Sequence, residues 1–95
     1  MSALIEVRVG ESFALPDLAE AGGTGYLWSI PQVPEAIRIV SSEHHQSEHA
    51  PAGASGVRRF VLQPMVSGTH NVVAELRRPW GSEARDRLTF EIHVV

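Results

Sequence analysis

The sequence predicts an all-β protein, an antiparallel β-sandwich of about seven short strands. Three observations lead to this fold class. Apolar and polar residues alternate with a period of two in several stretches, which is the pattern of half-buried strands. Glycine and proline turn signals separate these stretches at intervals of roughly eight to twelve residues. No stretch keeps a helical period between recognisable caps.

The amino-terminal half is expected to contain four strands. Apolar residues alternate over residues 5–9, and after a turn residues 13–15 form a short second strand or continue the first one after a bulge. Residues 16–20 have no strand pattern and are expected to form a loop, with one helical turn at most. The alternation returns over residues 26–30, where two prolines should end the strand, and again over 37–39.

The carboxyl-terminal half predicts three more strands, over residues 59–63, 68–76 and 88–94, the last with the cleanest alternation in the chain. Between the halves, residues 41–56 contain almost no large apolar side chains. Such a segment cannot offset the entropy of a packed conformation, so it is expected to be the most mobile internal loop.

Length and composition fit one domain over residues 1–95, expected to be a monomer without a cofactor. The chain has no cysteine, which excludes a disulfide and a thiol nucleophile. The net charge of −3 and the scattered arginines argue against nucleic-acid binding. Apolar runs are too short to span a membrane. No signal peptide is visible, so we expect a cytoplasmic protein or the mature form of an exported one.

Nothing in the sequence indicates an enzyme. There are only two aspartates and no Gly-x-Ser-x-Gly motif for a hydrolase triad. A glycine-rich phosphate loop would need a helix amino terminus, whereas residues 22–25 precede a strand. His44, His45 and His49, with Glu43 or Glu48, could supply metal ligands, but a loop gives them no fixed geometry. A solvated polar loop is the favoured interpretation, and a metal- or pH-responsive binding domain remains the weaker alternative.

Three glycine- and proline-marked segments lie where turns are expected. Their sequences are Gly-Gly-Thr-Gly-Tyr-Leu-Trp at residues 22–28, Gly-Ala-Ser-Gly at 53–56 and Arg-Pro-Trp-Gly at 78–81. Each segment by itself also fits an ordinary inter-strand turn. Alternate loops of a Greek-key sandwich emerge at the same end, however, so the three could form one composite edge.

These segments resemble three motifs of one protein family. Residues 24–28 are similar to the end of Asn-Pro-Thr-Thr-Gly-Tyr-x-Trp, residues 53–56 to Gly-x-Gly-Gly, and residues 76–80 to Tyr-x-Arg-Pro-Trp. Residues 5–13 resemble the first strand and turn of the same family. The motifs are those of the chagasin family, immunoglobulin-like inhibitors of papain-type cysteine peptidases. The resemblance extends over nearly the whole chain and implies an immunoglobulin-like β-sandwich.

The resemblance also implies a partner and a site. In the family the first loop, which corresponds to residues 22–28, approaches the catalytic cysteine of the peptidase. The second and third loops, which correspond to residues 53–56 and 78–81, clasp the cleft on either side. The residues expected to bind the peptidase are Gly23, Thr24, Gly25, Gly53, Ser55, Gly56, Arg78, Pro79 and Trp80. Thr24 and Gly25 would face the catalytic centre, and Trp80 would be the aromatic anchor. The alternative is a non-inhibitory interaction module that binds another protein through the loops or a sheet edge.

The first loop departs most from the family motif. Ala21, Gly22 and Gly23 stand where the family has Asn, Pro and Thr. Proline and asparagine stiffen a loop, whereas two glycines loosen it. Ser55 also replaces a glycine, and Leu76 replaces the tyrosine. We therefore expect the first loop to contribute less to binding than the third.

The strand pattern also predicts how single side chains are exposed. Trp28 lies in an alternating apolar strand and should be buried. Trp80 follows a proline in a loop and should be largely exposed, as interface anchors are before binding. Arg58, Arg59 and Arg77 are expected to be solvated strand residues.

Overall fold

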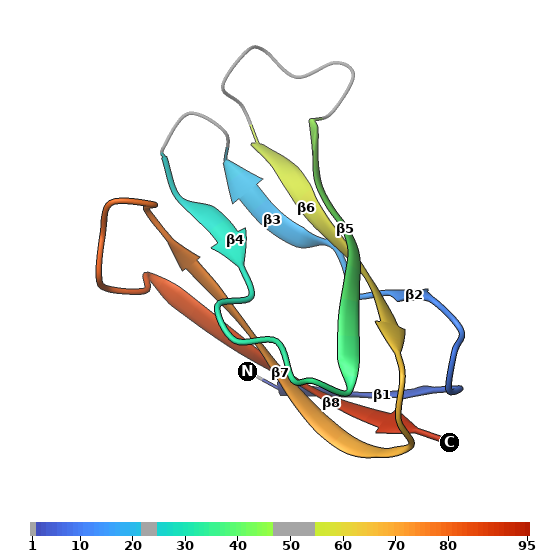
Figure 1. Ribbon diagram of the computed structural model, residues 1–95. Helices are drawn as coiled ribbons and strands as arrows, with labels where there is room; N and C mark the ends of the chain where they lie inside the picture. Colours follow the sequence, from blue (N-terminus) through green and yellow to red (C-terminus); the bar gives the residue numbers. More distant parts are fainter. Residues whose placement is uncertain (1, 22–24, 47–54) are drawn as a thin grey trace.

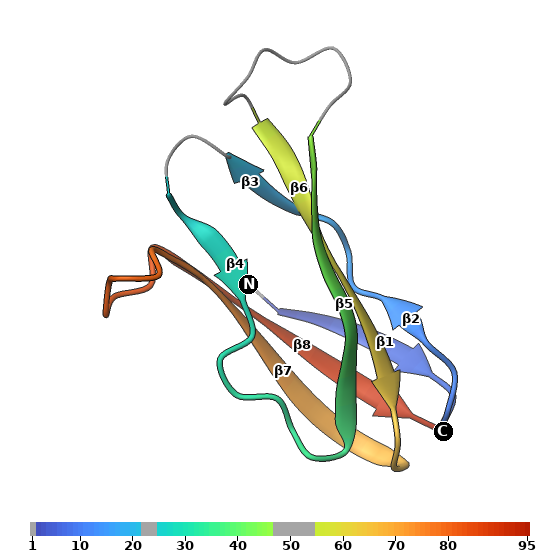
Figure 2. The same ribbon diagram turned by 45° about the horizontal axis from the view of Figure 1, so that its top comes forward.

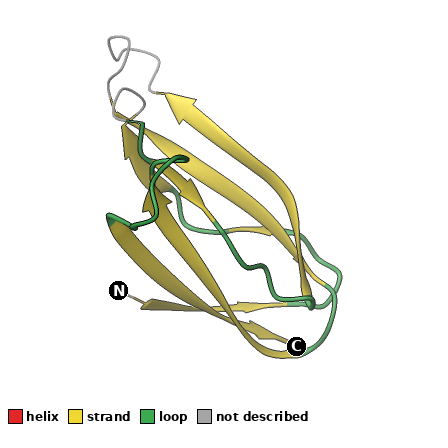
Figure 3. Ribbon diagram, turned by 60° about the vertical axis from the view of Figure 1, so that its left-hand side comes forward, coloured by secondary structure: helices red, strands yellow, loops and turns green. Residues whose placement is uncertain are grey.

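The computed structural model describes residues 2–21, 25–46 and 55–95, and these contain eight strands and no helix (Figures 1 and 3). The strands in chain order are β1 (Ser2–Val7), β2 (Phe13–Ala14), β3 (Leu18–Ala21), β4 (Leu27–Ser29), β5 (Ile37–Gln46), β6 (Ser55–Pro64), β7 (Gly68–Arg77) and β8 (Asp86–Val94). They form two sheets, which confirms the predicted all-β sandwich. No described segment is a helix that could cross a membrane.

The first sheet has the strand order β1-β8-β7-β4. β7 and β8 form a long antiparallel pair from Gly68–Val94 to Leu76–Asp86. β1 adds to β8 in parallel, and β4 pairs antiparallel with the last residues of β7. The carboxyl terminus is tied to this edge because the amide of Val95 donates to the carbonyl oxygen of Val7 at 2.9 Å.

The second sheet is organised around β6. β5 pairs antiparallel with it from Ile37–Pro64 to Gln46–Gly56, with a register shift between Ile39 and Ser41. β2 and β3 pair in succession with other parts of the same strand, β3 near its start and β2 near its end. Figure 2 shows this sheet and the first one as two separate layers.

The core lies between the two layers and consists of the inward-facing residues of the alternating strands. Its buried members are Leu15, Leu18, Trp28, Ile30, Ile37, Phe60, Leu62, Val72, Ala74, Phe90, Ile92 and Val94. Burial of this apolar surface is the main favourable term in a chain that has no disulfide. The predicted alternation of inward and outward residues is confirmed for β7 and β8.

The predictions of loops at residues 16–20 and 41–56 are wrong in part. Residues 18–21 form β3, because Leu18 and Glu20 both face inward and pair through their backbone with β6. Polar residues 41–46 are not a loop but continue β5 along β6, and Ser55 and Gly56 already belong to β6. Backbone pairing with β6 orders residues 41–46 without large apolar side chains. The rest of the expected mobile loop, residues 47–54, lies outside the described residues.

Candidate functional site

The described parts of the three singled-out segments lie toward one end of the sandwich. β3 ends and β4 begins there, as do the end of β5 and the start of β6, and the β7–β8 connection lies beside the start of β4 (Figure 1). The expected site residues Gly23, Thr24 and Gly53 lie outside the described residues. The structure describes Gly25, Ser55, Gly56, Arg78, Pro79 and Trp80.

The third loop presents an exposed tryptophan on a tight turn. The amide of Gly81 donates to the carbonyl oxygen of Arg78 at 2.9 Å, which closes a four-residue turn with Pro79 in its second position. Proline fits this position because its φ is already fixed near the required value. Trp80 is 75% exposed, whereas Trp28 is 6% exposed. The predicted contrast between the two tryptophans is confirmed.

The first and third loops touch through Gly25 and Trp80. Gly25 has a φ of 80°, and a Cβ atom built on it would lie 3.1 Å from Cη2 of Trp80. A side chain at residue 25 would therefore strain the backbone and push the indole away. The absence of a side chain lets the exposed indole lie against the chain where the first loop enters β4.

A stack of arginines and a tyrosine supports this contact. The guanidinium carbon of Arg78 lies 4.6 Å from the centre of the Tyr26 ring and 5.9 Å from that of Trp80. Arg85 lies 5.0 Å from the Tyr26 ring. Cation–π contacts of this kind contribute about 0.5–2 kcal/mol each, depending on desolvation. Tyr26 of the first loop is thus held by two cations from the β7–β8 connection.

Below the first and second loops lies a buried carboxylate. The side chain of Glu20 has no exposed surface, and it accepts hydrogen bonds from three strands. The amide of Trp28 donates to Oε2 at 2.7 Å, and Arg58 donates to both carboxylate oxygens, at 2.9 and 3.2 Å. Nδ1 of His44 lies 2.6 Å from Oε1. No buried side-chain nitrogen or oxygen of the described residues lacks a partner.

The expectation that Arg58 is an ordinary solvated strand residue is wrong. Its side chain is 15% exposed and is engaged with Glu20. Arg59, by contrast, is 46% exposed and pairs with Asp17 at the surface. The side chain of Arg77 is 37% exposed and lies 3.9 Å from Glu75. Arg58 differs because it shares the inward face of β6 with Phe60 and Leu62, where a cation needs a buried partner.

The base of the second loop is too tight for any residue other than glycine. Gly56 is buried, and a Cβ atom there would lie 2.6 Å from the carbonyl oxygen of His45 and 2.8 Å from Nε2 of His44. His44 turns toward Glu20, and His45 lies 3.3 Å from Glu43. Among the described residues no three possible ligands cluster as a metal site would require. His49 and Glu48 lie outside the described residues.

Ionisation of Glu20 is expected to stabilise the fold. Burial alone would raise the pKa of Glu20, but hydrogen bonds from Arg58, the Trp28 amide and His44 outweigh it and hold the pKa below its ordinary value. A group with a lowered pKa in the folded state stabilises that state above the pKa it has when unfolded. This stabilisation should be complete above about pH 5 and be lost as the pH falls through the lowered pKa.

Urea unfolding of the parent chain and of Glu20→Gln at several values between about pH 3 and pH 7 measures this effect. At pH 7 the variant should be about 2 kcal/mol less stable, because the partly buried Arg58 loses its charged hydrogen-bond partner. The difference should shrink toward pH 3. Asp17→Asn, which breaks an exposed pair with Arg59, should change little. A difference between parent and Glu20→Gln that stays constant with pH would contradict this assignment.

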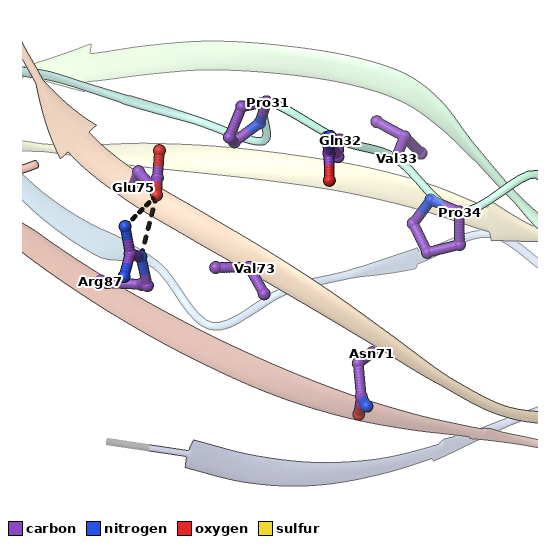
Figure 4. Close-up of a pocket in the computed structure, with 8 residues that line it drawn as sticks. All are labelled: Pro31, Gln32, Val33, Pro34, Asn71, Val73, Glu75 and Arg87. Carbon is purple, nitrogen blue, oxygen red and sulfur yellow. Dashed lines mark hydrogen bonds and ion pairs between the residues drawn. The ribbon is translucent and has the colours of Figure 1, made fainter. Parts of the chain in front are cut away.

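One hollow bounded by the described residues lies away from the three loops. It is an open groove of about 730 Å³ on the outer face of β7 and β8, beneath the segment that follows β4 (Figure 4). Its lining residues are Pro31, Gln32, Val33, Pro34, Asn71, Val73, Glu75 and Arg87. Glu75 and Arg87, which lie opposite each other on β7 and β8, form an ion pair of 2.6 Å at one end of the groove. The groove brings together none of the residues expected to bind a peptidase.

Three solved structures share this architecture. The cysteine protease inhibitor EhICP2 from Entamoeba histolytica is 22% identical, with a TM-score of 0.80 over 98% of this chain and 86% of its own. Amebosin is 23% identical, with a TM-score of 0.79 over 99% and 97%. PbICP-C, in complex with falcipain-2, is 22% identical, with a TM-score of 0.65 over 99% and 86%. These likenesses confirm the immunoglobulin-like sandwich.

A comparison with curated protein sequences gave no significant match. The sequence model of the chagasin family of peptidase inhibitors, I42, matches residues 6–94. That match spans all of the strands but the first residues of β1 and includes the described parts of the three loops. The chain therefore belongs to the chagasin family of peptidase inhibitors.

Proposed function

We propose that this protein is a reversible inhibitor of papain-family cysteine peptidases and blocks the active-site cleft with its three loops. Membership of a peptidase-inhibitor family supports the activity. Among the structures of similar fold, one is a cysteine protease inhibitor and one is seen in complex with falcipain-2. The observation that carries the proposal is the exposed Trp80, seated against Gly25 of the first loop.

The third loop is the anchor of the proposed contact. Trp80 offers a large apolar surface that is already exposed, and the turn at Pro79 limits the conformational entropy lost on binding. Arg78 holds the loop against Tyr26 and leaves a cation next to the indole. Tryptophan and arginine in such settings are typical binding hot spots.

The first and second loops complete the proposed contact surface. Gly23, Thr24 and Gly25 would approach the catalytic centre, where small residues let the backbone come close. Gly53 and Ser55 would contact the other side of the cleft, and Gly56 would set the shape of their loop from below. Inhibition requires no chemistry of the inhibitor: the loops occupy the substrate groove without offering a bond in the geometry needed for cleavage.

Competition for the cleft tests the proposal. The chain should form a complex with papain whose active site is free and should not bind papain whose cleft is filled by a covalent active-site inhibitor. Isothermal titration with both forms measures this directly. Equal binding to both forms would place the contact outside the cleft and favour the non-inhibitory interaction module.

A stiffer first loop is expected to strengthen inhibition. Replacing Ala21-Gly22-Gly23 with Asn-Pro-Thr should lower the inhibition constant about threefold, because a stiffer loop loses less conformational entropy on binding. Thr24→Ala in the parent chain should raise the constant by a similar small factor. Both constants are measured against papain with a fluorogenic substrate. A replacement that weakens inhibition would show that the glycines are needed for the fit.

A further inference from the structure

Glu20 brings together strands that enter and leave two different loops. It lies in β3, just before the first loop, and Trp28 lies in β4, just after it. His44 lies near the end of β5, before the second loop, and Arg58 lies near the start of β6, after it. One carboxylate is therefore bonded to the strand that follows the first loop and to both strands that flank the second.

The bond to Trp28 uses a main-chain group that no strand satisfies. The amide of Trp28 points away from β7 and toward the other sheet, where Oε2 of Glu20 accepts it at 2.7 Å. The indole Nε1–H of the same residue donates to the carbonyl oxygen of Ala19 at 2.8 Å. Both ends of the first loop are thus fixed to each other below the loop itself.

The bond to His44 extends the arrangement to the second loop. The imidazole that contacts Glu20 also packs over Gly56, with Nε2 only 2.8 Å from where a Cβ would be. Arg58 approaches the carboxylate from the opposite strand of the same hairpin and also donates to Oγ of Ser42 at 3.2 Å. Among the described residues, the charged or titratable groups that face Glu20 are His44 and Arg58, one from each strand of the hairpin.

We propose that Glu20 is a positioning residue for inhibition: its buried carboxylate ties the ends of the first loop to the base of the second, so that both loops meet the peptidase as one surface. The inference rests on the proposed function for its inhibitory part. A buried ion pair is suited to such a role, because separating the two charges costs much free energy. If either loop loosened and drew its strand away, the Glu20 carboxylate would be left buried without its full set of partners.

Inhibition constants of folded variants against papain test the proposal. Glu20→Gln should raise the constant about fivefold, mainly through faster dissociation, because two loops must then be ordered on binding. Arg58→Lys keeps the charge without the forked geometry and should shift the constant in the same direction. It serves as the second variant if Glu20→Gln does not fold.

Two controls separate positioning from loss of stability. Val94→Ala removes core volume at the far end of the sandwich and should lower the melting temperature without changing the inhibition constant. Asp17→Asn breaks an arginine–carboxylate pair on the surface of the same sheet and should also leave the constant unchanged. If Glu20→Gln changes inhibition no more than Val94→Ala does, the proposal is overturned.

Amide chemical shifts of the free protein give a readout that needs no peptidase. Glu20→Gln should move the signals of both Gly25, in the first loop, and Gly56, in β6 at the base of the second loop, whereas Asp17→Asn should move neither. If the parent chain does not inhibit papain, the proposed function fails, and these shifts still decide the link between the loops. Movement of one glycine alone, or of neither, would overturn it.

Discussion

Trp80→Ala is expected to raise the inhibition constant for papain about thirtyfold or more, which corresponds to about 2 kcal/mol of lost binding free energy. The indole is 75% exposed in the free protein, so its removal leaves no cavity in the fold. It is also the most exposed of the large apolar side chains among the described residues. The loss should therefore appear in binding and not in stability.

Steady-state inhibition with a fluorogenic substrate measures the Trp80 effect, and thermal unfolding shows that the variant is folded. Val66→Ala is a suitable control, because Val66 is 54% exposed in the turn between β6 and β7, at the opposite end of the molecule. Its inhibition constant should equal that of the parent. A change of less than about threefold for Trp80→Ala would remove the tryptophan from the proposed anchor role.

Gly25→Ala is expected to have the second largest effect, about tenfold on the inhibition constant. Alanine at a φ of 80° costs about 1–2 kcal/mol of backbone strain. Its Cβ would also meet Cη2 of Trp80 at 3.1 Å, so the indole would have to move away from the first loop. Both the first loop and the anchor would then be displaced by a single methyl group.

Gly10→Ala is the matched control for this prediction. Gly10 has a φ of 83°, nearly the same as Gly25, but no heavy atom lies within 4 Å of the position of its Cβ. The two variants should therefore lose similar stability in urea unfolding, while only Gly25→Ala weakens inhibition. Equal inhibition by both variants would show that the contact between Gly25 and Trp80 is unimportant for binding.

Much of the fold could be predicted because local patterns carry it. The alternation at β7 and β8, and the contrast between Trp28 and Trp80, depend on neighbours in sequence and on turn residues. The full length of β5 could not be predicted, since residues 41–46 are polar and are ordered by backbone pairing with β6. A pattern of side chains does not show pairing of this kind.

The buried carboxylate could not be predicted from the sequence. Glu20 is separated from His44 by 24 residues and from Arg58 by 38, so no local pattern connects them. A glutamate at an inward position also breaks the alternation of β3, which is why this strand resembled a loop. The loop motifs were visible because they are short and contiguous, whereas this cluster exists only after folding.

The central claim is tested most directly by the steady-state inhibition of papain by the unmodified chain at several concentrations of a fluorogenic substrate. The account predicts that the apparent inhibition constant rises linearly with substrate concentration, as it does for a reversible inhibitor that occupies the substrate cleft, and that the chain is recovered uncleaved. Papain activity that is unchanged at high micromolar concentrations of the folded chain would contradict it.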